Sequence, residues 1–214
     1  MKYILVLISV MMFSFKTSSE IDYRKVFGKD YAWAINWLKQ NGKIITVYSD
    51  KYNIPAKELK AIIFPELIRY NRVFDAIQIE SLKYLYVTEG KYYADFSVGF
   101  FQMKPSFAEK VELEADTVFG YKEQQDNEDS RRDRLIRLTK IETQVNYLCA
   151  FYRLCEKKFR LSESGQVDNK IKLFATAYNA GYHLPVDKLK ALQLRKHFSG
   201  SNYSDISLFY FNHE

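Results

Sequence analysis

Residues 54–70 decide the fold, because they combine the spacing of a helix with a charged residue where the core should be; they read IPAKELKAIIFPELIRY. Apolar residues recur at intervals of three and four along one helix face: Leu59, Ile62, Ile63, Leu67 and Tyr70. Glu66 falls on this same face, so its side chain is predicted to point inward. The segment is therefore predicted to be a central helix that carries a buried carboxylate.

The predicted position of Glu66 suits a general acid. Apolar surroundings disfavour the charged carboxylate, which raises its pKa and keeps a proton on it near neutral pH. Pro65 is a second irregularity, because proline inside a helix removes a hydrogen bond to the Ala61 carbonyl and costs about 3 kcal/mol. Two adjacent irregularities indicate a functional site. The structural alternative is a partly buried Glu66 that pairs with Arg69 or Arg72.

Length and composition predict one globular domain after an N-terminal leader. The chain has 214 residues, of which 47% are hydrophobic and 16% aromatic, so it can bury a substantial core and is not disordered. Helical spacing recurs along it, without strand-like alternation of useful length, internal repeats or low-complexity tracts. The predicted fold class is all-α, with residues 20–214 forming a single domain.

Residues 1–19 have the features of a secretory signal peptide. A short positive start is followed by an apolar run to Phe15, and Thr17 and Ser19 are small enough for a cleavage site. The apolar run is too short to span a bilayer. We expect cleavage and export to the periplasm or the cell exterior, with no membrane span in the mature chain; an uncleaved N-terminal anchor is the alternative.

Charge, cysteine and histidine content argue against several function classes. The formal charge of +6 is modest, and no basic cluster is interleaved with aromatic residues, so nucleic acid is not an expected partner. Cys149 and Cys155 face different ways on a predicted helix and are not expected to form a disulfide. The three histidines, His183, His197 and His213, lack the spacing of metal ligands, so neither a metal nor another cofactor is expected.

Helix signals divide the rest of the chain. Asn41-Gly42 is predicted to stop a helix, Ser130 is predicted to cap one, and the polar run 121–134 and residues 161–168 are predicted to be loops. Residues 95–105 are rich in turn signals. The predicted helices are 30–40, 44–52, 55–70, 71–93, 106–113, 135–159 and 171–180, with at least one more after residue 184.

Three motifs follow one another along the chain: Glu66 in its helix, GFFQMKP at 99–105, and AYNAG at 177–181. In this order they resemble the lysozyme-like lytic transglycosylase superfamily, which includes soluble lytic transglycosylases and goose-type lysozymes. In that family a glutamate ends the catalytic helix, a GLMQxxP turn lines the cleft, and an AYNAG segment closes it. The resemblance covers about residues 52–182 and implies a lysozyme-like helical domain with a cleft around the catalytic helix.

The resemblance implies a role for each motif. Glu66 is implied to be the catalytic acid and base, and Tyr178 to lie near it and to hydrogen-bond the acid or the substrate. A glycine at position 99 allows the backbone to approach a sugar closely, and the Gln102 amide both donates and accepts hydrogen bonds. The implied substrate-binding residues are Ser97, Gly99, Gln102, Tyr178 and Asn179.

The sequence departs from the family pattern around the acid. Leu67 stands where the family has serine, and 33 residues separate Glu66 from Gly99. Glu80 is therefore an alternative acid, because it is followed by Ser81 and lies 19 residues before Gly99, close to the goose-type spacing. Glu66 is preferred because residues 55–63 reproduce the family's helix, which makes residues 71–94 an insertion beside the cleft.

The implied activity is cleavage of the β-1,4 bond between N-acetylmuramic acid and N-acetylglucosamine in peptidoglycan, whose glycan strands are the expected partner. A lytic transglycosylase needs only Glu66, whereas an inverting hydrolase needs a second carboxylate about 6.5–9.5 Å away. Asp95 and Glu80 are the candidates for that second carboxylate. The alternatives are a goose-type muramidase, a non-catalytic glycan-binding module and an exported helical interaction protein; no protein partner follows from the sequence.

Overall fold

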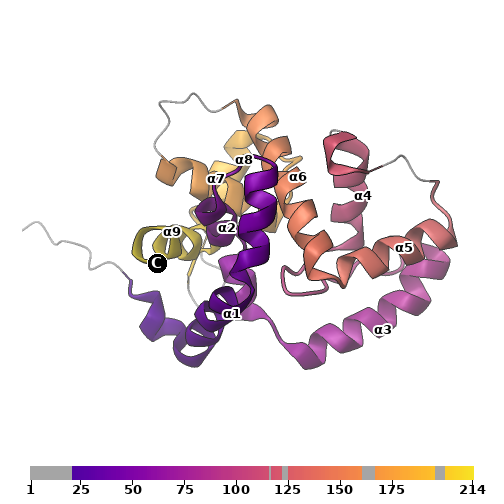
Figure 1. The fold of residues 1–214 in the computed structure, drawn as a ribbon, viewed down its shortest axis with the longest axis horizontal. Helices are drawn as coiled ribbons and strands as arrows, with labels where there is room; N and C mark the ends of the chain where they lie inside the picture. Colours follow the sequence, from indigo (N-terminus) through magenta and orange to yellow (C-terminus); the bar gives the residue numbers. More distant parts are fainter. Residues whose placement is uncertain (1–20, 116, 122–124, 161–166, 196–200) are drawn as a thin grey trace, which may run out of the picture.

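The computed structural model consists mainly of α-helices joined by short connections (Figure 1). It describes residues 21–115, 117–121, 125–160, 167–195 and 201–214. Within these ranges the structure has no strand; an isolated bridge joins Val98 and Met103, and the predicted all-α fold class is confirmed. The predicted leader and residues 161–166 of the predicted loop at 161–168 lie outside them, whereas Val167 and Asp168 belong to a helix, so the loop prediction is wrong for these two residues. The described helices are α1 (Tyr23–Lys51), α2 (Ala56–Arg69), α3 (Arg72–Glu89), α4 (Pro105–Glu114), the short 3-10 helix η1 (Thr117–Phe119), α5 (Glu128–Leu138), α6 (Ile141–Phe159), α7 (Val167–Ala180), α8 (Val186–Leu192) and α9 (Tyr203–His213).

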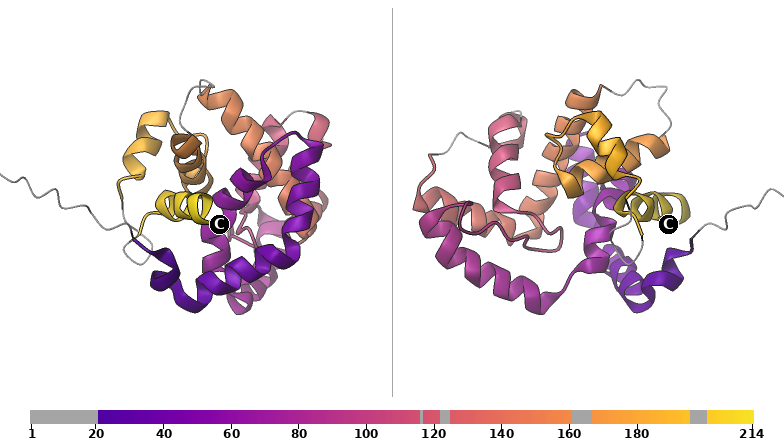
Figure 2. Two further views of the ribbon diagram at one scale, coloured as in Figure 1. Left: turned by 60° about the vertical axis from the view of Figure 1, so that its left-hand side comes forward. Right: turned by 180° about the vertical axis from the view of Figure 1, so that it is seen from behind.

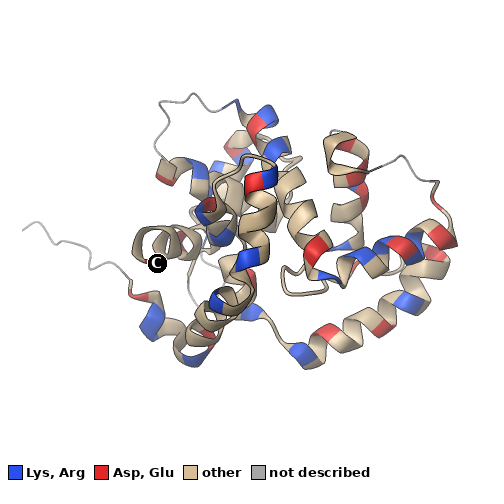
Figure 3. Cartoon of the chain, viewed as in Figure 1, with Lys and Arg blue, Asp and Glu red and all other residues tan. Residues whose placement is uncertain are grey.

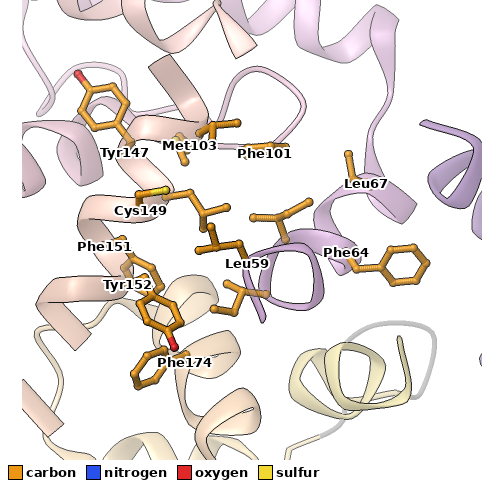
Figure 4. Packing of buried hydrophobic residues seen from close by; sticks show 14 of the residues in the cluster. Leu59, Phe64, Leu67, Phe101, Met103, Tyr147, Cys149, Phe151, Tyr152 and Phe174 are labelled. Carbon is orange, nitrogen blue, oxygen red and sulfur yellow. The ribbon is translucent and has the colours of Figure 1, made fainter. Parts of the chain in front are cut away.

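α2 lies at the centre of the molecule and packs against α1, α6, α7 and α9 (Figures 1 and 2). Its residues are buried without interruption from Ala61 to Ile68. Figure 4 shows Leu59 on the side of α2 that faces α6, while the Phe64 ring lies between Tyr31 of α1 and Tyr210 of α9, at centroid distances of 4.9 and 4.3 Å. The sequence predicted one buried face, whereas the structure buries this helix nearly all round.

A buried ion pair ties the first turn of α2 to two of its neighbours. The Glu58 carboxylate lies 2.7 Å from Lys170 Nζ of α7 and accepts a hydrogen bond from the Tyr152 hydroxyl of α6 at 2.6 Å. A buried carboxylate without such partners would strongly destabilise the fold. Glu58 therefore fixes how α2 sits against α6 and α7.

α1 runs unbroken past Asn41-Gly42, so the predicted helix stop at this pair is wrong. The Asn41 side chain donates to the Trp37 carbonyl of the same helix at 3.0 Å. A Cβ atom at Gly42 would lie 3.4 Å from Lys60 Cε, an ordinary contact, so α1 passes close to a side chain of α2 here. The chain bends instead at Gly28, which has φ 46° and ψ −113°.

The predicted long helix at 135–159 is two helices, α5 and α6, which meet at Thr139 and Lys140. The Thr143 hydroxyl donates to the Lys140 carbonyl at 3.0 Å, within the first turn of α6. α5 begins within the polar run that was predicted to be a loop. Its cap is Asn127, whose side chain accepts from the Ser130 backbone at 2.9 Å, so the predicted cap at Ser130 is wrong.

A buried charge cluster joins α3, α4, α5 and α6 at the other end of the molecule from α9. Both Glu112 oxygens lie 2.8 Å from an arginine, one from Arg134 and the other from Arg137, and the Tyr147 hydroxyl also donates to this carboxylate. Arg134 also donates to the Tyr86 hydroxyl of α3 at 2.7 Å. Burial alone would raise the pKa of Glu112, but hydrogen bonds from Arg134 and Tyr147 outweigh it and lower the pKa.

Replacing Glu112 by glutamine should lower the free energy of unfolding by about 3 kcal/mol, because it leaves two arginines without their buried counter-charge. Urea unfolding at neutral pH measures the difference. Glu114→Gln is the matched control on the same helix. Its carboxylate is partly exposed and lies 3.8 Å from Lys110, so the control should change stability by no more than about 0.5 kcal/mol. Equal effects of the two variants would contradict the role given to the cluster.

Candidate active site

A cavity of about 950 Å³ lies where four segments distant in the sequence meet. Its wall is formed by the carboxyl end of α2, the turn at 95–104, helix α4, and the carboxyl end of α7 with the residues that follow it. Glu66, Ser97, Gln102, Tyr178 and Asn179, which the sequence placed in one site, all line this cavity. Gly99 and Glu80 do not.

Glu66 is buried as predicted, with 6% of its surface exposed. Burial raises its pKa from an ordinary 4.5 to about 7, although Arg69 and the nearby Tyr203 hydroxyl oppose the shift. The Arg69 guanidinium lies 3.6 Å from Glu66 Oε2 and is partly exposed, which weakens its effect. Near neutral pH Glu66 can therefore hold a proton within reach of the cavity.

Tyr203 is a site residue that the sequence did not predict. It is the first residue of α9, and its hydroxyl donates to the Ile62 carbonyl at 3.1 Å and lies close enough to Glu66 to lower the pKa of that carboxyl. The phenol has one proton, so it can donate to Ile62 when Glu66 is protonated and to the carboxylate when Glu66 is ionised. The sequence does contain a signal for the start of α9, because Asn202 is a residue type that caps helices. In the structure its side chain accepts a hydrogen bond from the Ser204 backbone.

Tyr178 lies close to Glu66, but its hydroxyl is engaged elsewhere. The hydroxyl donates to the Phe101 carbonyl at 2.7 Å. Burial first, and then the charge of Glu66, raise the pKa of Tyr178 well above its ordinary value, so it stays protonated. Tyr178 thus joins α7 to the turn at 95–104 and forms part of the cavity wall next to the carboxylate.

The turn at 95–104 is held by its own backbone and by Gln144 of α6. Val98 and Met103 exchange two backbone hydrogen bonds of 3.0 Å. Gly99 has φ 74°, and a Cβ atom there would lie 1.7 Å from Gln144 Nε2. The close approach that Gly99 allows is therefore to Gln144 and not to the cavity, which corrects its predicted place in the substrate site.

Gln102 occupies the tip of this turn with φ 49°, a strained conformation for a residue with a side chain. Its amide nitrogen donates to the Gly99 carbonyl at 2.8 Å, which uses one of its two amide hydrogens. Its side chain lines the cavity near Ser97, and exposed Asn179 contributes a second amide from α7. Hydroxyl and amide groups therefore line the same cavity as the Glu66 carboxylate.

Neither alternative carboxylate is placed like Glu66. Glu80 lies on α3 outside the cavity, exposed and 2.7 Å from Lys83, which argues against it as the acid. Asp95 lines the cavity, but its two oxygens accept hydrogen bonds from the backbone and hydroxyl of Ser106, at 2.8 and 2.7 Å. Asp95 therefore holds the first turn of α4.

The other acidic side chains of the cavity are paired with cations. Glu109 lies 2.7 Å from Lys91, and Glu112 belongs to the buried cluster. His183 also lines the cavity, where burial and then nearby Lys110 lower its pKa. Among the described residues, no group of three or more histidine, cysteine or acidic side chains could hold a metal ion.

No protein-family model, curated protein or solved structure matches this chain. Function is therefore inferred from the geometry of the cavity and from the order of the motifs.

Replacing Glu66 by glutamine should make stability less dependent on pH. Between pH 4.5 and 7 folded Glu66 holds a proton that the unfolded chain releases, so the free energy of unfolding falls as pH rises through this window. The total loss is about 3 kcal/mol. Glu66→Gln should match the wild type at pH 5 and exceed it at pH 8, as measured by urea unfolding. Glu80→Gln is the control, and a pH-independent difference for Glu66→Gln would contradict the burial of the charge.

Proposed function

We propose that this protein is a peptidoglycan lytic transglycosylase that cleaves the β-1,4 bond between N-acetylmuramic acid and N-acetylglucosamine, with Glu66 as its general acid and base. The observation that carries the proposal is the buried carboxyl of Glu66 in the cavity wall, whose pKa is raised to about 7, whereas that of buried Glu112 is lowered. Such a group holds a proton at neutral pH and can also accept one back. This is the requirement of a two-step glycosidase that uses one residue for both transfers.

The cavity walls support a carbohydrate as the substrate. Gln102, Asn179 and Ser97 offer amide and hydroxyl groups, and Phe107 of α4 and Tyr178 of α7 offer aromatic surface. Sugars present hydroxyl and acetamido groups for the former and apolar ring faces for the latter. The volume of about 950 Å³ is ample for more than one sugar ring.

In the first step, protonated Glu66 transfers its proton to the glycosidic oxygen as the bond from that oxygen to C1 breaks. The acetamido carbonyl of the same N-acetylmuramic acid residue attacks C1, which closes an oxazolinium ring and leaves Glu66 ionised. In the second step, ionised Glu66 takes the proton of the 6-hydroxyl as that oxygen attacks C1 and the oxazolinium ring opens. The product is a 1,6-anhydro sugar, and Glu66 is protonated again.

Neighbouring groups adapt the site to both protonation states of Glu66. The Tyr203 hydroxyl can turn from the Ile62 carbonyl to the carboxylate once the first proton has left. Arg69, 3.6 Å away, stabilises the same anion. Hydrolysis in the manner of a muramidase is the second candidate, because Asp95 lines the same cavity, but its oxygens are bonded to Ser106.

Peptidoglycan lies outside the cytoplasm, so the proposed substrate requires the export that residues 1–19 predict. These residues are outside the described ranges. None of the helices in the described part of the chain has both the length and the apolar character needed to cross a membrane.

Digestion of purified sacculi tests the proposal. We expect soluble muropeptides with 1,6-anhydro ends, identified by mass spectrometry, and a rate that falls as pH rises above about 7 because Glu66 loses its proton. Reducing ends, one water heavier, would instead indicate hydrolysis. Binding to sacculi without any soluble product between pH 4 and 8 would indicate a non-catalytic module and would contradict the proposed activity.

Glu66→Gln should abolish this cleavage, whereas Tyr178→Phe should retain measurable turnover. The phenylalanine loses only a hydrogen bond to the Phe101 carbonyl, worth about 1 kcal/mol or up to about tenfold in rate, while the proton donor has no substitute. Glu80→Gln is the control and should keep nearly full activity. An inactive Glu80→Gln beside an active Glu66→Gln would reverse the assignment of the acid.

A further inference from the structure

Beyond Tyr178 the cavity continues to the segment that follows α7, where none of the side chains takes part in the proposed cleavage. Tyr182 lies there, and Phe151 of α6 contacts both tyrosines, at ring-centroid distances of 5.2 Å to Tyr178 and 5.8 Å to Tyr182. Lys110 of α4 lies over the Tyr182 ring, 5.5 Å from its centroid, and His183 is the next residue along the chain. Lys110, Tyr182 and His183 all line the cavity, and we call them its cationic end.

The Tyr182 hydroxyl is buried without a hydrogen-bond partner among the described residues, and only 3% of the residue is exposed. Such a group costs free energy, and native structures rarely keep one without a reason. Burial, and then the nearby Glu114 carboxylate, raise the pKa of Tyr182, so the hydroxyl keeps its proton. The neighbouring side chains of Lys110 and Glu114 are 35% and 41% exposed and can move aside. The hydroxyl is therefore a donor available to a group that enters the cavity.

Positive charge gathers around this end of the cavity. Three lysines on three helices act on the His183 imidazole: Lys110 of α4, Lys158 of α6 and Lys188 of α8. Lys158 is in the last turn of α6, and Figure 3 shows basic residues at this end of the helix. Neither Lys158 nor Lys188 forms a salt bridge with a described carboxylate. Glu114, 3.8 Å from Lys110, acts in the opposite direction, but the balance favours an anionic ligand.

The donors of the cationic end suit a carboxylate. An ammonium group forms a charge-assisted hydrogen bond with a carboxylate, which is about twice as strong as a neutral one. Burial, and then Lys110, lower the pKa of His183, so its imidazole is neutral near pH 7 and supplies one N–H. Together with the Tyr182 hydroxyl, these groups offer donors to both oxygens of one carboxylate.

We propose that the cationic end binds a carboxylate of the peptide that N-acetylmuramic acid carries. This inference rests on the proposed function, in which the same N-acetylmuramic acid residue presents its bond at C1 to Glu66. The charge of Glu66 acts on Tyr178, and one aromatic ring, that of Phe151, separates Tyr178 from Tyr182. A peptide attached to the sugar at Glu66 can therefore reach Lys110. The cationic end thus selects peptide-bearing glycan strands over bare ones.

Isothermal titration calorimetry with a matched pair of muropeptides tests this selection. The first probe is N-acetylglucosaminyl-N-acetylmuramic acid with its peptide, and the second is the same compound with its carboxylates converted to amides. Neither probe has a further sugar on C1 of N-acetylmuramic acid, so neither can be cleaved. We expect the wild type to bind the carboxylate probe about tenfold more tightly, which is the contribution of one charge-assisted hydrogen bond.

Two substitutions one turn apart on α4 should act in opposite directions. Lys110→Met removes the ammonium group, so this variant should bind both probes alike. Glu114→Gln removes the opposing charge, so it should bind the carboxylate probe more tightly and leave the amide probe unchanged. Tyr182→Phe should weaken binding of the carboxylate probe without lowering stability, because the hydroxyl has no partner to lose. Lys83→Met, on α3 outside the cavity, is the matched control and should keep the tenfold preference.

Equal affinity of the wild type for the two probes would overturn the inference, and so would a preference that Lys110→Met leaves unchanged. The free peptide, without sugars, is a third probe, and binding as tight as that of the carboxylate probe would overturn the assignment to a glycan site. Cleavage of sacculi without a preference between the probes would contradict this inference alone. A preference that depends on Lys110, without cleavage of sacculi, would support the cationic end and contradict the proposed activity.

Discussion

The burial of α2 on nearly all sides is the constraint on which the rest of the structure depends. A helix surrounded by α1, α6, α7 and α9 must satisfy each polar side chain that it buries, because no water is available to do so. Glu58 meets this requirement with Lys170 and Tyr152. Glu66 meets it differently, by keeping its proton beside the Tyr203 hydroxyl.

Glu66 and Glu112, two of the three glutamates buried in the described part of the chain, show how environment assigns roles to one chemical group. Glu112 is surrounded by Arg134, Arg137 and Tyr147, which hold it ionised and make it a junction between helices. Glu66 has one partly exposed arginine at 3.6 Å, whose effect is smaller than that of burial, so its pKa rises. Only the second environment produces a group that can exchange a proton near neutral pH.

The cavity is made by tertiary packing of segments that are individually unremarkable turns and helix ends. Gln144 of α6 holds the turn at 95–104 in place, and Tyr178 of α7 fastens the same turn through the Phe101 carbonyl. Asp95 in turn caps α4, which forms the facing wall. The residues around Glu66 are thus positioned by contacts between elements more than 40 residues apart in the chain.

The sequence alone determined the all-helical class, the central helix and the inward direction of Glu66, because helical periodicity is a local property that side chains repeat every turn. It did not determine that α1 continues through Asn41-Gly42, that Gly99 faces Gln144, or that Tyr203 of α9 reaches Glu66. Each of these depends on which distant segment packs against the residue, and contacts with distant segments leave no periodic signal in the sequence. The inward direction of the Glu66 side chain can therefore be predicted from the local sequence, whereas its neighbours in the fold and its pKa depend on tertiary structure.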